Sequence, residues 1–258
     1  MRLFGAHRFI LTAMPEGPSI VILKEEAWKF TGKKILTVSG NSKIDQERLE
    51  GQKVIAIQSW GKHFLICFTG FTLRIHFLLF GSYRIDEEKP DANPRLAFTF
   101  ENGELNFYSC SVKFLEGDLD AHYDWSVDVM NDAWNPGKAK AKLKEHPEML
   151  VCDALLEQDI FAGVGNIIKN EVLYRIKVHP ESRVGKLPAK KLDEMIKEAR
   201  IYSFQFLEWK KQFELKKHWL AHTKTWCLRC NLPIEKKQHL GIKKRRSFFC
   251  TNCQVLYA

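Results

Sequence analysis

The sequence predicts an α+β protein: an N-terminal helix plus an antiparallel β-sandwich, followed by a helical domain and a four-cysteine zinc finger. Three observations support this fold class. Short β-type runs fill most of the first half, the composition becomes helix-forming after about residue 137, and two CxxC pairs stand near the C-terminus. The 258 residues, 45% of them hydrophobic, suffice to bury a core and to form two domains.

The first element is a helix that opens at Pro18 and Ser19 and stops at Gly32. Its apolar residues recur at helical spacing and define one face: Ile20, Leu23, Ala27 and Phe30. This face is expected to pack on the sheets that follow.

The strands come next, as β-type runs at 33–38, 53–60, 63–68, 71–77 and 82–85. Two further runs, 95–100 and 104–110, flank Glu101-Asn102-Gly103, and Asn-Gly between two such runs is a strong hairpin signal. The first half is therefore expected to be one helix plus an antiparallel β unit.

Turn residues without periodicity fill 124–137, where we place the linker, and the chain beyond it is helical in composition to about residue 220. The predicted divisions are a leader at 1–13, a β-sandwich domain at 14–126, a helical domain at 127–224 and a zinc finger at 225–258. No uncharged apolar run approaches the ~20 residues of a membrane span.

The positive charge lies in the second half. Residues 127–258 hold 25 Lys and Arg against 15 Asp and Glu, whereas residues 1–126 hold 15 against 16. A solvated basic face is the simpler alternative, but an excess confined to one half and densest at 243–246 favours a phosphate backbone as partner.

A four-thiolate metal site is indicated by Cys227, Cys230, Cys250 and Cys253, two CxxC pairs separated by 19 residues. Four cysteines leave no open coordination position, so we expect one structural zinc ion whose ligation supplies the folding energy of the module. Arg245 and Arg246 are expected on a hairpin between the pairs, where they would face DNA; a zinc module for protein contacts is the alternative.

A glycine turn between two helices stands at Gly163-Val-Gly165-Asn166. The glycines let the backbone approach a ligand, and a helix beginning at Asn166 would point free N–H groups at a phosphate. Turns of this kind also occur merely to join packed helices.

The stretch MPEGP at 14–18 has the form of a protein start inside the chain. If Met14 is the initiator, its removal leaves Pro15 with a free secondary amine beside the Glu16 carboxylate; if translation starts at Met1, that nitrogen is an amide. The first thirteen residues carry two Arg and no acid. A misassigned start is preferred here to a transit peptide.

Taken together, these motifs resemble the formamidopyrimidine-DNA glycosylase / endonuclease VIII family of base-excision repair enzymes. The resemblance runs from Met14 to the C-terminus through MPEGP, GKHF at 61–64, HFLLFG at 76–81, AGVGNIIKNEVLYRIKVHP at 162–180, and CLRC with RRSFFCTNCQ. It implies a β-sandwich domain, a helix-two-turns-helix domain with the zinc finger, and duplex DNA with oxidised bases or abasic sites as partner.

The resemblance also implies residue roles. Pro15 is similar to the amine nucleophile, Glu16 to the acid/base and Lys62 to a lysine that contacts the phosphate beside the lesion. On the DNA side it implies His76 as a backbone support, Leu78, Leu79 and Phe80 as the inserted segment with Leu79 as the wedge, and Gly165, Asn166 and Arg245 near the phosphates. Chemistry on a stacked base requires extrusion of the nucleotide, and apolar side chains can fill the gap.

Two positions depart from the family pattern. Ser19 stands where a glutamate is common, and residues 108–113 lack the arginine-rich loop of the branch that excises 8-oxoguanine. We therefore expect the endonuclease VIII side, with oxidised pyrimidines as substrates. The expected activity is that of a glycosylase and abasic-site lyase acting as a cytoplasmic, nucleoid-associated monomer. A non-catalytic zinc protein that binds damaged DNA and a lyase with little base excision are the alternatives.

Overall fold

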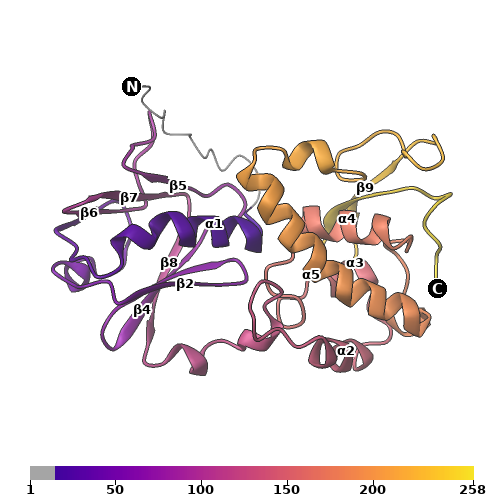
Figure 1. Cartoon of the computed structure of the whole chain (residues 1–258), viewed down its shortest axis with the longest axis horizontal. Coiled ribbons are helices and arrows are strands. Elements are labelled where there is room, and N and C mark those ends of the chain that lie inside the picture. Colours follow the sequence, from indigo (N-terminus) through magenta and orange to yellow (C-terminus); the bar gives the residue numbers. More distant parts are fainter. Residues whose placement is uncertain (1–14) are drawn as a thin grey trace. The chain divides into compact units, whose positions relative to one another are not determined.

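The computed structural model describes residues 15–258, which form two compact units. The first unit comprises Pro15, 24–58 and 64–117; the second comprises 16–23, 59–63 and 118–258. The second unit thus includes two short segments from the first half of the sequence. Cutting the chain at one point would not separate the two units. The predicted domain boundaries stay predictions. Figure 1 colours the chain by sequence, from indigo at the N-terminus through magenta and orange to yellow at the C-terminus.

The predicted N-terminal helix is confirmed as α1 (Gly17–Ala27), extended by a short 3₁₀ turn η1 (Trp28–Phe30). All four residues of its apolar face are 0–1% exposed. The helical pattern ends at Gly32, whose φ of +81° lies in the left-handed region that favours glycine.

Two four-stranded sheets build the β-sandwich, in the orders β1-β6-β7-β5 and β2-β3-β4-β8. The strands are β1 (Thr37–Ser39), β2 (Ala56–Trp60), β3 (His63–Cys67), β4 (Phe71–His76), β5 (Ser82–Ile85), β6 (Leu96–Phe100), β7 (Gly103–Tyr108) and β8 (Ser111–Glu116), with a 3₁₀ turn η2 (Glu47–Leu49). The hairpin predicted at Asn102-Gly103 is the β6–β7 connection, where Phe100 pairs with Gly103. Sequence patterns missed β8, an edge strand paired with β4 over its full length.

Phenylalanine rings fill the core of the first unit. Phe107 packs against Phe64 at 5.9 Å between ring centroids and against Phe98 at 6.3 Å, and so joins the two sheets. Phe30 stacks on Phe100 at 4.4 Å, which attaches the end of the N-terminal helix to the same core.

The second unit carries the remaining helices: α2 (Pro136–Lys144), α3 (Val151–Ala154), α4 (Asn166–Arg175) and α5 (Ala189–Lys211), with 3₁₀ turns η3 (Leu119–Ala121), η4 (Trp125–Val127), η5 (Val184–Lys186) and η6 (Leu215–His218). α5 is the long helix in Figure 1, and its apolar residues at helical spacing bury one face. α4 is buried on all sides, since the first nine of its ten residues are inaccessible. Neighbouring elements therefore surround α4, and its polar side chains need partners.

The zinc-finger region carries the predicted hairpin, formed by the antiparallel strands β9 (Glu235–Leu240) and β10 (Arg245–Phe249). Arg245 and Arg246 begin β10. Within residues 15–258 no helix is both long enough and apolar enough to cross a membrane.

Candidate active site and four-cysteine cluster

Three glycines from distant parts of the chain meet in the second unit. The backbone N–H of Gly17 donates to the carbonyl of Gly163 at 2.8 Å. A Cβ added to Gly17 would lie 2.9 Å from the Cα of Gly163, and one added to Gly61 would lie 3.0 Å from its nitrogen. Gly61 and Gly163 also have positive φ angles, +52° and +96°. Only glycines permit this close approach. It brings Glu16, which precedes Gly17, and Lys62, which follows Gly61, close to the turn at Gly163.

Glu16 is the first residue positioned by this contact, and it is 1% exposed. Its carboxylate accepts hydrogen bonds from the backbone N–H groups of Gly165 at 3.1 Å, Ile167 at 2.7 Å and Ile168 at 3.2 Å. The first N–H groups of a helix have no acceptor within the helix, and the Glu16 carboxylate supplies that acceptor at the start of α4.

This arrangement corrects one sequence expectation. The N–H groups expected to face a phosphate are occupied by Glu16, and the N-cap of α4 is Gly165, one residue before Asn166. A Cβ at Gly165 would lie 2.4 Å from Cδ of Glu16, so the glycine makes room for the carboxylate. The helix terminus binds an anion as its chemistry predicts, but the anion is part of the protein.

The pKa of Glu16 is raised by burial, and the nearby Lys62 and the three backbone donors partly offset that rise. A carboxyl group with a raised pKa is suited to donate a proton near neutral pH.

Lys62 lies in the turn between β2 and β3 and is only partly exposed. Its pKa is lowered to about 8: removal of the amine from water lowers it most, the Glu16 carboxylate raises it, and Arg245 and Lys243 also lower it. These influences mean that the three cationic side chains and the carboxylate share one electrostatic environment. A phosphate placed there would relieve the repulsion between the cations.

Asp128 supports the turn that carries Lys62, and sequence reasoning missed it. Its 3% exposed carboxylate accepts from the backbone N–H groups of Gly61 and Met130, each at 2.9 Å. The backbone N–H of Val129 donates to the carbonyl of Ala162, beside the glycine turn. An aspartate between two valines in a turn-rich segment is the signal that could have indicated a buried acceptor.

Asn166 is 5% exposed at the start of α4, and its Oδ1 has no hydrogen-bond partner among residues 15–258. A buried polar atom without a partner is costly, so the amide is a candidate ligand contact.

The predicted insertion segment lies in the first unit, in a tight turn after β4. The backbone N–H of Gly81 donates to the carbonyl of Phe77 at 2.8 Å, and Leu78 has a φ of +54°. An apolar run usually lies in the core. This one does not, because Leu78, Leu79 and Phe80 are 54%, 44% and 86% exposed. Nδ1 of His76 accepts from the N–H of Leu78 at 3.4 Å.

Pro15 is buried and directly precedes Glu16. Met14 and the leader lie outside the described residues. The predicted site residues are thus divided: Glu16, Lys62, Gly165, Asn166 and Arg245 belong to the second unit, whereas Pro15, His76 and the 78–80 segment belong to the first.

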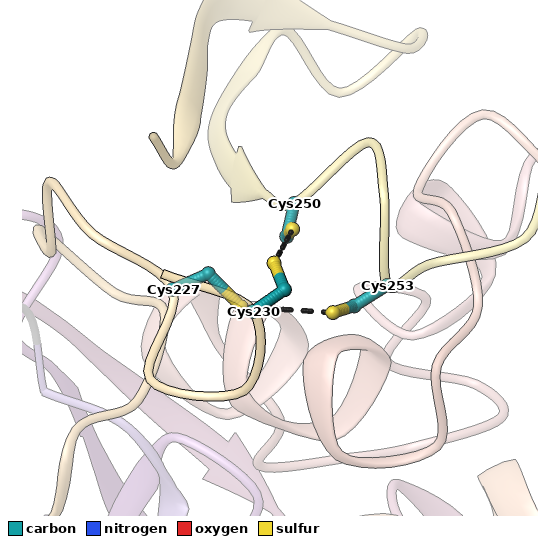
Figure 2. A group of neighbouring side chains, drawn as sticks. All are labelled: Cys227, Cys230, Cys250 and Cys253. Carbon is teal, nitrogen blue, oxygen red and sulfur yellow. Dashed lines mark hydrogen bonds between the residues drawn. The ribbon is translucent and has the colours of Figure 1, made fainter. Parts of the chain in front are cut away.

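The four cysteines are brought together as predicted. Figure 2 shows their side chains converging from two loops, and all four sulfurs lie within 4.8 Å of one another. The sulfurs of Cys227 and Cys253 are 3.8 Å apart and those of Cys230 and Cys250 are 3.5 Å apart. Tetrahedral Zn–S bonds of ~2.3 Å require sulfurs about 3.8 Å apart, so the cluster fits a structural metal ion.

Buried polar side chains of α4 fix the cysteine module to the helical domain. Glu171 accepts from the backbone N–H groups of residues 220–222, just before the first cysteine pair. Lys169 donates to the carbonyl of Arg246 and to Ser247, and Asn170 accepts from the N–H of Phe248. The same helix therefore holds Glu16 at its N-terminus and the cysteine module along its length.

The chain thus combines a β-sandwich, a set of helices with a buried glycine turn, and a four-cysteine module, which together define the class of fold. The formamidopyrimidine-DNA glycosylase N-terminal domain model matches residues 14–114, and the formamidopyrimidine-DNA glycosylase H2TH domain model matches residues 126–202. The chain belongs to the formamidopyrimidine-DNA glycosylase / endonuclease VIII family.

Relatives come from both branches of the family. The chain is 29% identical to mouse endonuclease 8-like 3 over 77% of its own length but spans only 34% of that relative. It is 27% identical to the formamidopyrimidine-DNA glycosylase of Mycoplasmopsis pulmonis, covering 93% of this chain and 98% of the relative. The fold matches Lactococcus lactis formamidopyrimidine-DNA glycosylase bound to abasic-site DNA, with a TM-score of 0.81, 21% identity and coverage of 93% and 99%.

Proposed function

We propose that the chain is a bifunctional DNA glycosylase and abasic-site lyase of base-excision repair, which acts as a monomer on oxidised bases in duplex DNA. The observation that carries this proposal is Glu16: a buried carboxyl group with a raised pKa, held by three backbone donors and adjacent in sequence to Pro15.

In the proposed reaction the free amine of Pro15 attacks C1′ of the damaged nucleotide. The bond from nitrogen to C1′ forms as the bond from C1′ to the base breaks, and the base leaves with a proton. Glu16 protonates the ring oxygen, which opens the sugar and leaves a Schiff base. The iminium nitrogen then draws electrons during loss of the C2′ proton, so that the 3′ phosphate departs; a second elimination releases the 5′ phosphate, and water frees the enzyme.

This route requires a free Pro15 nitrogen. A nitrogen joined to Met14 by a peptide bond has no lone pair to offer, so initiation at Met14 with methionine removal, or processing at that bond, must precede catalysis. A chain-terminal amine is well suited, because at ordinary pKa values roughly a quarter of it is neutral near pH 7.4.

Lys62 is the second amine that could form a Schiff base. With a pKa of about 8, roughly a tenth of it is neutral at pH 7, far more than for an ordinary lysine. If Pro15 stays within the chain, the Lys62 amine, whose charge interacts with that of Glu16, could form the Schiff base instead. We nevertheless assign Lys62 first to the phosphate beside the lesion, with Asn166 and Arg245.

Extrusion of the base is assigned to the exposed turn after β4. Leu79 is the proposed wedge, with Leu78 and Phe80 beside it, and their exposure supports a role at a surface. Oxidised pyrimidines are the preferred substrates in this proposal, because β7 ends at Tyr108 and β8 begins at Ser111. Two residues leave no room for a long arginine-rich loop.

The metal in the cysteine cluster is proposed to be one zinc ion with a structural role. Four cysteines and sulfur spacings suited to a tetrahedral ion support it. When bound, the ion would hold the hairpin that carries Arg245, and none of the catalytic steps passes through it.

Borohydride trapping on an abasic-site duplex tests the reaction. Two forms are compared, one beginning at Pro15 and one retaining residues 1–14, with mass spectrometry of each N-terminus. The form beginning at Pro15 should be crosslinked, and chemical blocking of its amine should end the crosslinking. Trapping that persists after blocking and is lost in Lys62→Gln would assign the Schiff base to Lys62.

If both forms bind the duplex and neither is trapped, the chain is a non-catalytic binder of damaged DNA. A Pro15 nitrogen held in a peptide bond favours this alternative, because it cannot attack the sugar. Release of thymine glycol compared with release of 8-oxoguanine then tests the substrate class, and a lyase without base excision would release neither.

A further inference from the structure

The tip of the β9–β10 hairpin is fixed to the helical domain by Asp153. This residue lies in α3 and is 3% exposed. One carboxylate oxygen accepts from the backbone N–H of Ile242 at 2.8 Å, and the other accepts from that of Lys243 at 3.0 Å. Both oxygens are therefore engaged by two successive residues of the turn.

The fit at this contact is close. Gly241 has a φ of +68°, and a Cβ added to it would lie 2.2 Å from Oδ2 of Asp153. Glycine suits this position for two reasons: it adopts the positive φ angle, and it has no Cβ to collide with the Asp153 carboxylate. The Lys243 amine adds an ion pair with Glu157 at 2.7 Å, on the segment that follows α3.

Arg245 lies between this anchor and a second one on β10. Beyond it, Lys169 donates to the carbonyl of Arg246 at 3.0 Å and to Ser247 at 2.7 Å. The pairing of the two strands is irregular between Arg245 and Ser247, so the strand ladder alone does not determine the direction of Arg245. An isolated two-stranded hairpin is at best marginally stable, so external anchors decide its orientation.

The direction of Arg245 matters because its charge reaches Lys62, whose turn is held independently of the hairpin by the Gly61–Gly163 contact and by Asp128. A guanidinium and an amine can share one phosphate only if both are held at the right separation. We propose that Asp153 is a positioning residue that holds the hairpin tip so that Arg245 and Lys62 engage the same DNA phosphate. This inference rests on the proposed function, since it presupposes DNA binding.

Asp153→Asn tests the proposal, because an amide can accept from one of the two N–H groups but not from both. Asp159→Asn, an exposed acid on the same segment, is the control for the loss of one negative charge. Affinity for a duplex with a tetrahydrofuran abasic analogue is measured by fluorescence anisotropy over a range of salt. Asp153→Asn should bind about tenfold more weakly, with the salt slope reduced by about 0.9, as expected for one lost phosphate contact.

A thermodynamic cycle with Arg245→Ala separates positioning from general destabilisation. If Asp153 acts through Arg245, the double variant binds no more weakly than Arg245→Ala alone. Losses that multiply, or an Asp153→Asn variant that binds like the wild type, would overturn the proposal. If wild-type protein does not bind the duplex, the proposed function fails; if it binds and only Arg245→Ala weakens binding, this inference alone fails.

Zinc content and hydrogen exchange show whether Asp153→Asn keeps its fold. The amides of Ile242 and Lys243 should exchange faster, while those of α4 stay protected. Should the variant lose zinc or unfold, Gly241→Ala takes its place in the same cycle, because its Cβ would displace the tip from the intact carboxylate. Additive losses in that cycle would equally reject the proposal.

Discussion

The carboxylate of Glu16 accepts a 2.7 Å hydrogen bond from the backbone N–H of Ile167, 151 residues further along the chain. The candidate acid is thereby part of the start of α4, and α4 also holds the four-cysteine module. Changes at either end of this helix should affect the other.

Glu16→Gln should abolish most base excision. An amide of the same shape keeps one acceptor for the α4 donors but cannot donate a carboxyl proton, and general acid catalysis typically contributes about 10²–10⁴-fold. Single-turnover release of thymine glycol measures the loss, with exposed Glu50→Gln as the control. Excision at the wild-type rate would remove Glu16 from the chemistry.

Gly165→Ala should destabilise the protein through its contact with Glu16. The new Cβ would lie 2.4 Å from the carboxyl carbon, and overpacking of a buried site costs about 1–3 kcal/mol. In a Glu16→Ala background that cost should largely disappear, because the colliding atoms are gone. Urea denaturation of the four proteins measures the coupling; equal costs in both backgrounds would contradict the geometry.

DNA affinity should fall as the pH rises from 7 to 9. The pKa of Lys62 in the free protein is lowered to about 8, so its cation is present below that pH and is lost above it. Lys62→Arg should flatten this dependence, because a guanidinium stays charged. Lys169 also has a pKa lowered to about 8, but it titrates in both proteins and cannot account for a difference between them. Anisotropy titrations at constant ionic strength decide the matter, and matching pH profiles would exclude Lys62.

Removal of the metal should unfold the cysteine module and remove most DNA affinity. Zinc ligation contributes an apparent ~10–16 kcal/mol in zinc-finger peptides, and this module has few buried apolar residues of its own. Elemental analysis should give one zinc per chain, and Cys253→Ser should reproduce the effect of a chelator. Undiminished binding by metal-free protein would count against a structural ion.

Leu79→Ala should lower excision of a paired lesion with little change in stability, because a 44% exposed side chain contributes little to folding. Phe77→Ala is the contrasting variant: Phe77 is 1% exposed, and truncation of a buried phenylalanine costs about 3–5 kcal/mol. Excision rates and thermal unfolding should separate the two. An abasic site, which has no base to extrude, should be cleaved by Leu79→Ala at nearly the wild-type rate.

Several features could be predicted from the sequence because each is set by residues close together in the chain. The face of α1 follows from helical spacing, the β6–β7 hairpin from Asn102-Gly103, and the metal ligands from the two CxxC pairs. The helix face and the hairpin are local patterns whose geometry the backbone fixes within a few residues, and each CxxC pair is local too, although the two pairs meet only in the fold. The edge strand β8 lacks such a pattern, since its burial depends on a partner far away in the chain.

Tertiary structure alone decided which group occupies the start of α4, and that Asp128 and Asp153 hold backbone turns. These facts depend on residues separated by tens to more than a hundred positions, and a buried acceptor looks the same in sequence as an exposed one. The sequence by itself therefore determined the family resemblance and the ligand chemistry of the metal site. The fold decided which donors, carboxylates and cations meet, because only packing sets the distances on which hydrogen bonds and charge interactions depend.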